Sequence, residues 1–442
     1  MKKFICCAAV LLLGVSLSAA TLFKDGERAV FFGDSITSQG VNGYLSYMTT
    51  LYHSHYPGSV NIYCAGIPGD SAFGGLRSLK LDVLDRKPTR VFVWFGGNDL
   101  RYNLYLKGGK KLSAQQVKAF ETCKKNLVKI YDQLQRAGVK AVAVTPSPFF
   151  YFNGEKSNFN EDGLAKLSAF IIKTAKERKM EYIDLYTPMY EAMKKNPEIE
   201  AYYKDKVHPN ALGQLMIAYC MLKQMDFDGT VADVEIDAAG AKTVKAKYAE
   251  IRDLQKTAKG IRFTYVPERL PFVYKNTSQR NIDRLFPFSK DINNENLCVK
   301  GLAAGKYRLI AGKRTVGTFT AEELAKGINL AVLPTPSADA SRRLDRFCRQ
   351  IGNAQGNLRN IRQGDRLIGF GKVPKDPAER DKAIDAKVKK INSKYYYAVA
   401  KNYKKNFREE AKLTQLVERL MSQVRKNCVP QAFAVSIERA AK

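Results

Sequence analysis

Two short stretches of the sequence hold side chains that could act together on a carbonyl group. FFGDSITSQG (residues 31–40) leaves an apolar run and turns at once through Gly33-Asp34-Ser35, whereas KDKVHPNALGQ (residues 204–214) places Asp205 three residues before His208. A carboxylate at that spacing can reach back to the Nδ1 side of the imidazole, fix its tautomer and stabilise the imidazolium. Nε2 is then free to take a proton from a serine. The candidate chemistry is nucleophilic attack by a serine hydroxyl, with His208 as base.

Each stretch also has an ordinary structural explanation. Gly, Asp and Ser are the residues that tight turns favour for backbone reasons, so Gly33-Asp34-Ser35 alone identifies no nucleophile. Asp205 could instead bond backbone N–H groups before a helix that begins at Pro209, and His208 would then be incidental. Taken one at a time, both stretches leave the two interpretations open.

Two further loops carry groups that could stabilise a developing oxyanion. FGGNDL (residues 95–100) places Asn98 at the end of the apolar run RVFVWF, where its side-chain N–H could donate to such an oxygen. AGIPGDS (residues 65–71) follows VNIYC, and its glycines permit unusual dihedrals and a close backbone approach. The N–H of Gly69 could therefore point into the same cleft.

The elements that must position these groups alternate in type over the first half of the chain. Apolar, β-rich runs (AVFFG, VNIYCAG, RVFVWFG, KAVAVTP and EYIDLY) are separated by helical patterns near residues 42–55, 72–85, 113–137, 160–179 and 209–226. The alternation predicts a parallel sheet that is covered by helices on both faces. Active sites of such sheets lie just past the carboxyl ends of strands, and the Ser35 turn and the Asn98 loop both follow a strand.

With four such blocks in order, the chain resembles the SGNH, or GDSL, hydrolase superfamily. The blocks are G-D-S at 33–35, G-x-x-G at 66–69, G-x-N-D at 96–99 and D-x-x-H-P at 205–209, within residues 27–226. The resemblance implies a flavodoxin-like three-layer α/β/α fold, with Ser35 as nucleophile, His208 as general base and Asp205 as its orienting partner. It also implies an oxyanion hole made by the backbone N–H groups of Ser35 and Gly69 and the side chain of Asn98, and no metal or organic cofactor.

Two details bear on this resemblance. A second G-D-S occurs at 69–71, but its glycine and aspartate fit the family's second block, so Ser71 is expected to be structural. The asparagine that often precedes the glycines of that block is replaced by Cys64-Ala65, which affects the expected shape of the loop. No G-x-S-x-G occurs, which argues against the nucleophile elbow of α/β-hydrolases.

The second half of the chain has a different pattern. Residues 229–335 contain the strand-like runs VADVEID, IRFTYV, LCVKGL and KYRLIAGKRTVGTFT, and predict a small antiparallel, β-rich unit with a hairpin turn at Gly312-Lys313. Residues 336–442 predict a basic helical region. Within it, KYYYAVAKNYKKNF (394–407) is either a helix whose tyrosines pack and whose lysines stay in water, which we favour, or a contact surface for glycan or nucleic acid.

The start of the chain predicts export. Residues 1–20 combine Lys2-Lys3, an apolar run and Ser18-Ala19-Ala20, as in a cleavable signal peptide, and the hydrolase domain would then span residues 21–228. Cys6 and Cys7 follow only two apolar residues, which disfavours a lipoprotein anchor. We expect a secreted or periplasmic protein.

The cysteines and histidines left over by the four blocks indicate no metal site. The six later cysteines show no C-x-x-C spacing, and Cys64, Cys123 and Cys220 fall in apolar patterns typical of buried thiols. Export would permit disulfides among Cys298, Cys348 and Cys428, but the sequence does not pair them. His53 and His55 are expected to be exposed residues at the end of a helix.

The predicted function is hydrolysis of a carboxylic ester through an acyl-enzyme, with acetyl groups on an extracellular carbohydrate as the favoured substrate. A lysophospholipase or thioesterase is the alternative within the same fold. The alternative from another class is a non-catalytic protein that binds a polyanionic glycan. Residues 229–442 carry 43 Lys/Arg against 22 Asp/Glu, so this basic half could hold an acidic glycan or an anionic surface, whereas export disfavours nucleic acid.

Overall fold

The structure, a computed structural model, describes residues 20–106, 111–150, 157–197 and 205–440. The predicted signal peptide therefore lies outside the described residues, except for Ala20. A five-stranded sheet in the order β2-β1-β3-β4-β5 forms the centre of the first half of the chain, and all its neighbouring strands are parallel. Its strands are β1 (Glu27–Gly33), β2 (Val60–Gly66), β3 (Arg90–Trp94), β4 (Lys140–Val144) and β5 (Glu181–Ile183).

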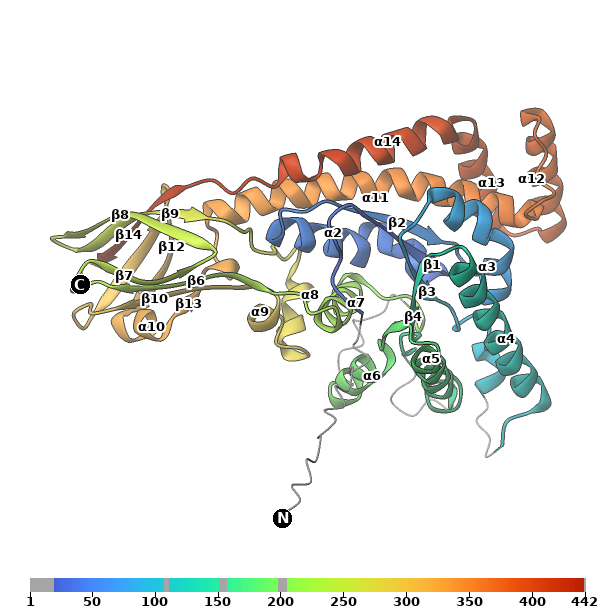
Figure 1. The fold of residues 1–442 in the computed structure, drawn as a ribbon, viewed down its shortest axis with the longest axis horizontal. Helices are drawn as coiled ribbons and strands as arrows, with labels where there is room; N and C mark the ends of the chain where they lie inside the picture. Colours follow the sequence, from blue (N-terminus) through green and yellow to red (C-terminus); the bar gives the residue numbers. More distant parts are fainter. Residues whose placement is uncertain (1–19, 107–110, 151–156, 198–204, 441–442) are drawn as a thin grey trace, which may run out of the picture.

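Alternating side chains of these strands form two separate cores, one on each face of the sheet. Phe31 and Phe92 belong to one core, whereas Phe32 and Val93 belong to the other, as the period of two in a strand requires. The first core is covered by α2 (Tyr44–His55), α6 (Tyr186–Lys195) and α7 (Ala211–Gln224). The second is covered by α3 (Ala72–Ser78), α4 (Ala114–Arg136) and α5 (Lys166–Glu177). The predicted three-layer α/β/α fold is thus confirmed (Figure 1).

The β-rich part forms two sheets that pack on a third core. One sheet has the order β13-β10-β6-β7, and the other has the order β12-β11-β14-β9-β8. The first contains β6 (Thr230–Asp237), β7 (Lys242–Lys247), β10 (Asn294–Lys300) and β13 (Ile328–Asn329). The second contains β8 (Ala249–Thr257), β9 (Gly260–Pro267), β11 (Lys306–Ala311), β12 (Arg314–Thr320) and β14 (Phe433–Arg439). The pairing is antiparallel throughout except between β6 and β10, which are parallel, so the expectation of a wholly antiparallel unit is corrected.

The helical region joins the β-rich part at the C-terminus. It contains α11 (Pro336–Ile368), α12 (Pro377–Ile391), α13 (Lys394–Asn406) and α14 (Glu410–Gln423), after which the chain returns to the β-rich part as β14. β14 lies between β9 and β11 in their sheet, so that sheet takes strands from both sides of the boundary predicted at residue 335. In Figure 1, α11 and α14 run side by side from the β-rich end along the five-stranded parallel sheet.

Helix α11 packs directly on the edge of the five-stranded parallel sheet. The Gln355 side chain accepts a hydrogen bond from the N–H of Cys64 at 2.6 Å and donates to the carbonyl of Ile62 at 3.0 Å. It therefore pairs with the edge strand β2 as a neighbouring strand would. Leu344, Ile351 and other apolar residues of α11 belong to the same core as the α3–α5 face of the sheet. The helical region thus packs as part of the same core as the parallel sheet.

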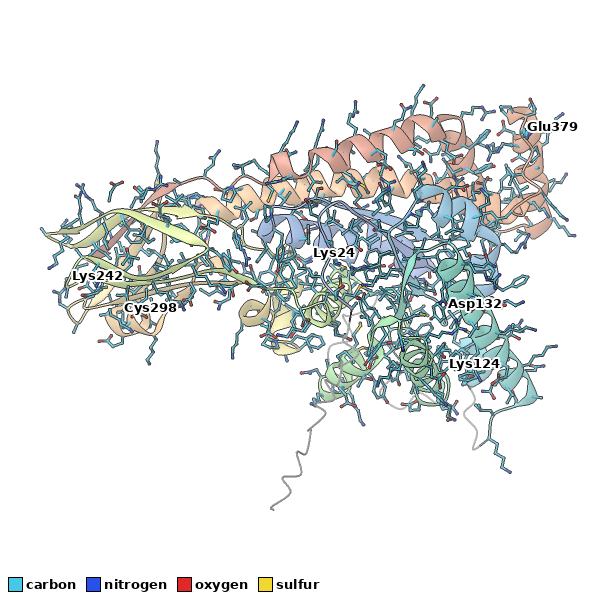
Figure 2. All side chains as sticks on the ribbon, viewed as in Figure 1. Lys24, Lys124, Asp132, Lys242, Cys298 and Glu379 are labelled. Carbon is cyan, nitrogen blue, oxygen red and sulfur yellow. The ribbon has the colours of Figure 1, made fainter. Side chains whose placement is uncertain are left out.

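The remaining cysteines are free thiols. Cys64, Cys123, Cys220, Cys298 and Cys348 are buried, and Cys428 is half-buried. Figure 2 shows that Cys298 lies in the β-rich end of the molecule, opposite the end that carries Glu379 on α12. Among the residues described, no helix is both long and apolar enough to cross a bilayer.

Candidate active site

Ser35 is placed by a sharp change from strand to helix. Strand β1 ends at Gly33, Asp34 caps the next helix by accepting a hydrogen bond from the N–H of Ile36 at 2.9 Å, and Ser35 is the first residue of that helix, α1 (Ser35–Gln39). An aspartate is a favoured N-cap because its carboxylate satisfies a free backbone donor. Ser35 therefore stands at the carboxyl end of β1, where the sequence predicted it.

The imidazole of His208 links Ser35 to Asp205. His208 Nε2 lies 2.9 Å from Ser35 Oγ, and His208 Nδ1 lies 2.8 Å from Asp205 Oδ2, although serine and histidine are 173 positions apart in the chain. The other carboxylate oxygen of Asp205 accepts from the backbone N–H groups of Val207 and His208, each at 2.7 Å. The turn between residues 205 and 208 therefore holds both partners, and the structure brings the three predicted side chains together.

The electrostatics of Asp205 suit a role as an ionised partner. Burial by itself raises the pKa of this carboxyl, but hydrogen bonds from the His208 ring and from the two backbone N–H groups outweigh it, so the pKa is lowered overall. An ionised Asp205 accepts from Nδ1–H and leaves Nε2 as the acceptor that faces the serine hydroxyl. This arrangement can remove a proton from Ser35 Oγ and return it to a leaving group.

Gly69 occupies the position that the sequence predicted beside Ser35. Its φ of +72° follows Pro68, and the N–H of Asp70 donates to the carbonyl of Ile67 at 3.1 Å, as in a type II turn. Such a turn leaves the N–H of its third residue outside its own hydrogen bond. Within the described residues the N–H groups of Gly69 and Ser35 have no acceptor, so both can donate to a substrate oxygen.

Asn98 lies between these groups and the buried Asp34. Its Nδ2 donates to the carbonyl of Asp70 at 2.7 Å, which orients the amide, and makes a long contact of 3.4 Å with Asp34 Oδ2. Burial raises the pKa of Asp34 to about 7, opposed by the bond from Ile36 N–H. Since the contact with Asp34 is long, the second amide hydrogen of Asn98 can turn to a stronger acceptor.

Ser35 and His208 line two adjoining cavities. A cavity of about 530 Å³ also contains Gly69 and Asn98, together with Tyr102, Phe149 and Val207. A second cavity of about 510 Å³ extends along α11 and contains the side chains of Asn357, Asn360 and Gln363. Tyr395 of α13 borders both. The sequence indicated an amphipathic helix in this region, but not that its polar face forms a wall of the active site.

Arg366, near the end of α11, is a second contribution that the sequence did not reveal. Its guanidinium donates to the carbonyl of Gly69 at 2.7 Å and pairs with the buried carboxylate of Asp70 at 3.2 Å. These contacts hold the loop that carries the Gly69 N–H. No sequence pattern pairs two segments that lie 297 positions apart.

The other candidates have structural roles. Ser71 caps α3 by accepting from the N–H of Gly74, in agreement with the expectation for the second G-D-S. His53 and His55 are each only 5% exposed, so the expectation that they are exposed is wrong. Leu270 and Cys428 bond to the backbone of this helix end and cover it. Among the described residues, no group of three or more His, Cys, Asp or Glu could hold a metal ion.

Comparison with known proteins places this geometry in a family. The chain is 25% identical to the acetylxylan esterase of Geobacillus stearothermophilus over 46% of this chain and 95% of that protein. It is 28% identical to the uncharacterized lipoprotein YqeF of Bacillus subtilis over 36% of this chain and 63% of that protein.

A solved structure resembles nearly the whole chain. The structure of a gut microbial diltiazem-metabolizing enzyme superimposes with a TM-score of 0.84 at 25% identity, over 96% of this chain and 100% of that one. The likeness therefore includes the β-rich and helical parts as well as the hydrolase sheet. The sequence model of the GDSL-like lipase/acylhydrolase family matches residues 31–215, and over these residues the chain belongs to that family.

Proposed function

We propose that the protein is an exported serine esterase that removes short acyl groups, above all acetyl groups, from a carbohydrate. The observation that carries the proposal is the chain of contacts from Asp205 through His208 to Ser35, 2.8 Å and 2.9 Å long, at the junction of two cavities. The match to an acetylxylan esterase over 95% of that protein supports the choice of acetyl esters.

The proposed reaction has two halves. Ser35 Oγ attacks the ester carbonyl while His208 takes its proton, and the oxyanion accepts from Ser35 N–H, Gly69 N–H and Asn98 Nδ2. The alcohol leaves with the proton from His208, and Ser35 is acylated. Water then attacks the acyl-enzyme with His208 again as base, which releases the carboxylic acid and restores the serine hydroxyl.

The assignment of Ser35 is tested by labelling with a fluorophosphonate and mapping the modified residue. We expect the label on Ser35 and the loss of both labelling and p-nitrophenyl acetate hydrolysis in Ser35→Ala. Ser71→Ala, in the second G-D-S, is the matched control and is expected to retain both. Hydrolysis by folded Ser35→Ala at the parent rate would refute the mechanism.

The alternative of a lysophospholipase or thioesterase is tested by acyl chain length. The cavity that contains Gly69 and Asn98 also contains the apolar groups of Tyr102, Phe149 and Val207, so an acyl chain would extend there. Although this cavity could take a longer chain, the proposed substrate is an acetyl ester, so we expect kcat/KM to fall from p-nitrophenyl acetate to octanoate to palmitate. A preference for palmitate would support the lipid alternative instead.

The basic half of the chain motivates a separate docking role. Residues 229–442 carry 43 Lys/Arg and 22 Asp/Glu, and this excess of positive charge would favour an acidic glycan or an anionic surface. Salt-sensitive retention of the full chain on pectin, at a pH where pectin is ionised, supports docking. If the chain elutes from pectin at the same salt concentration as from a column of uncharged polymer, docking on an acidic glycan is excluded.

A further inference from the structure

The cavity along α11 is lined by an unusual concentration of side-chain amides. Six of its lining residues are Asn or Gln, contributed by the helix after Ser35, the following turn and α11: Gln39, Asn42, Asn353, Asn357, Asn360 and Gln363. Each primary amide carries an acceptor oxygen and two donor hydrogens. The cavity therefore presents both donors and acceptors, which a group with several hydroxyls can use.

Several of these amides are left without a protein partner. The side chains of Asn357 and Asn360 are half-buried and make no hydrogen bond within the described residues. The Oε1 atom of Gln39 is buried and likewise accepts no hydrogen bond among the described residues. By contrast, Asn42 and Asn353 bond to each other at 3.0 Å. The unpartnered amides are therefore available to a ligand. A hydrogen bond from the ligand stabilises a buried amide most, because that amide has already lost its contact with water.

The asparagines of α11 that line the cavity recur on one face of the helix. Asn353, Asn357 and Asn360 are spaced by four and three residues, so they lie on one side of the helix. The apolar residues Leu344, Ile351 and Leu358 of the same helix are buried in the core. The helix thus has one face for the hydrolase core and a separate polar face for the cavity.

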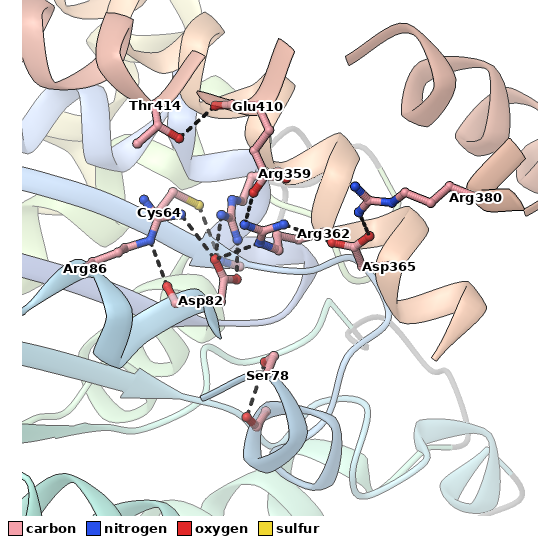
Figure 3. A network of polar contacts seen from close by, with 12 residues as sticks. Cys64, Ser78, Asp82, Arg86, Arg359, Arg362, Asp365, Arg380, Glu410 and Thr414 are labelled. Carbon is pink, nitrogen blue, oxygen red and sulfur yellow. Dashed lines mark hydrogen bonds and ion pairs between the residues drawn. The ribbon is translucent and has the colours of Figure 1, made fainter. Parts of the chain in front are cut away.

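The lining of the cavity favours an uncharged ligand. Besides His208, its only ionisable lining groups are Arg359 and Tyr395. Arg359 is 3% exposed and forms a paired contact with both carboxylate oxygens of the buried Asp82, as Figure 3 shows. Because that guanidinium is buried and bonded to Asp82, the described lining residues offer neither an exposed, unpaired cation to an anionic ligand nor a carboxylate to a cationic one.

Tyr395 adds an aromatic surface at the mouth of the cavity. Its side chain is 54% exposed, and its hydroxyl accepts a hydrogen bond from Gln363 Nε2 at 2.7 Å. This bond fixes one end of the ring while the ring itself stays open to solvent. An exposed ring that is held in place can pack on the apolar face of a sugar ring.

The two cavities differ in a way that orients the ester. Only the cavity with Tyr102 and Phe149 contains the oxyanion donors Gly69 and Asn98, so the carbonyl and its acyl group belong on that side. His208 lines both cavities and can protonate an oxygen that leaves toward α11. The alcohol portion of the ester then lies against the amides.

We propose that this amide cavity is a binding subsite for the hydroxyl-rich alcohol portion of the ester, a sugar ring of an acetylated glycan. Asn357 and Asn360 determine specificity by bonding the free hydroxyls, while Gln363 holds Tyr395, which packs on the ring. The inference rests on the proposed esterase function and adds that α11 and α13 select the substrate. It makes the helical region part of the enzyme's specificity.

The experiment compares two acetate esters that differ in free hydroxyls. Purified full-length variants are assayed with a monoacetylated methyl xyloside and with cyclohexyl acetate, which has a ring of the same size and no hydroxyl. We expect the parent protein to prefer the xyloside in kcat/KM. The double variant Asn357→Ala/Asn360→Ala should lower that preference by about tenfold, the effect of one or two hydrogen bonds to uncharged hydroxyls.

Matched controls come from the same helices. Gln350→Ala changes an exposed amide of α11 outside the cavity and should keep the preference of the parent, and Tyr397→Ala is the exposed control for Tyr395→Ala on α13. Tyr395→Ala is expected to lower the preference as the amide variants do. An equal loss on both esters, or an unchanged preference, would overturn the subsite.

Failure of the subsite is distinguishable from failure of the esterase function. If the parent hydrolyses cyclohexyl acetate as well as the xyloside, and this activity needs Ser35, the esterase stands and the subsite is refuted. If neither ester is hydrolysed and fluorophosphonate does not label Ser35, the esterase function itself is refuted.

Discussion

At the scale of single residues, the site depends on a few directed hydrogen bonds between distant parts of the chain. Asp205 holds His208 through the ring and through its backbone N–H, and His208 meets Ser35 at 2.9 Å. Asn98 is oriented by its bond to the carbonyl of Asp70 at 2.7 Å. His208 and Asn98 are therefore each positioned by one partner and keep another ring or amide nitrogen position directed toward the reaction.

Asn98→Ala should mainly lower kcat. Loss of an oxyanion donor removes an interaction that is strongest in the transition state, so we expect kcat for p-nitrophenyl acetate to fall about 10²-fold with little change in KM. Steady-state kinetics, with thermal unfolding to show that the variant is folded, measures this. A rise in KM at unchanged kcat would mean that Asn98 binds the ground state only.

Asp205→Asn tests the orienting carboxylate. The amide keeps the size of the side chain but cannot stabilise an imidazolium, so kcat should fall at least about 10²-fold. Because the lowered pKa of Asp205 reflects stability that is present above its unfolded value and lost in acid, the variant should also lose less stability than the parent between pH 6 and 3. If the parent and the variant lose the same stability over this pH range, the coupling of Asp205 to His208 is contradicted.

At the scale of elements, α11 and the β-strands impose constraints on the site and on stability. Helix α11 has 33 residues and reaches from the β-rich end to the Gly69 loop, where Arg366 bonds the Gly69 carbonyl.

In the β-rich part, strand β10 carries Glu295 into the core between the two β-sheets. That carboxyl is fully buried and accepts one hydrogen bond, from the Tyr265 hydroxyl at 3.1 Å.

Arg366 is expected to be a positioning residue. In Arg366→Gln the Gly69 loop loses the guanidinium that bonds the Gly69 carbonyl and the Asp70 carboxylate. Because the loop supplies a transition-state donor, kcat should fall about tenfold while KM changes less. Arg366→Lys should restore part of kcat. Arg343→Gln, on an exposed part of the same helix, is the control, and an equal loss in it would show a general effect of helix charge.

Glu295→Gln should stabilise the protein above neutral pH. Burial raises the pKa of Glu295 to about 7, opposed by the bond from Tyr265. The contribution of protonated Glu295 to the free energy of unfolding is therefore fully present below the unfolded pKa of this carboxyl, and it is lost as the pH rises through 7. We expect the variant to gain about 1–3 kcal/mol over the parent at pH 8 and little at pH 5, as measured by thermal unfolding. A gain that is equal at both pH values would contradict ionisation as the cause.

At the scale of the whole molecule, a buried ionic network joins the hydrolase to the helical region (Figure 3). Asp82, which is fully buried in the segment after α3, pairs with Arg359 of α11 and Arg86. Arg362 continues the network to Asp365 at 2.9 Å, and Asp365 pairs with Arg380 of α12 at 2.9 Å. The network lies beside the shared apolar core, so both halves stabilise each other.

Arg359→Met should destabilise the whole chain by about 3–5 kcal/mol, because it leaves the buried Asp82 carboxylate with fewer partners. The triple variant Asp82→Asn/Arg86→Met/Arg359→Met removes the carboxylate together with the two guanidinium groups that pair with it, and should recover part of the loss. Urea unfolding of the single and triple variants measures the difference. A triple variant as unstable as the single one would show that the loss comes from packing.

The sequence by itself determined the hydrolase fold and the identities of the triad and oxyanion candidates. Strand periodicity, the four motif blocks and their order are local properties, and parallel strands bring their carboxyl ends to one edge whatever the loops do. By themselves the G-D-S and D-x-x-H-P stretches each left a structural and a chemical interpretation open. The resemblance then assigned roles to Ser35, Asp205 and His208, and to Gly69 and Asn98.

Only the tertiary structure decided what surrounds that edge. The contact of Arg366 with Gly69 and the positions of Asn357 and Tyr395 in the cavity with Ser35 depend on how each helix rotates and where it docks. A helical pattern in the sequence specifies neither. The burial of His53 and His55 depends likewise on segments more than 200 positions away in the chain. Contacts between such distant segments follow from the packing of whole elements, which is why motifs identified the chemistry and the fold alone showed the cavity that would select its substrate.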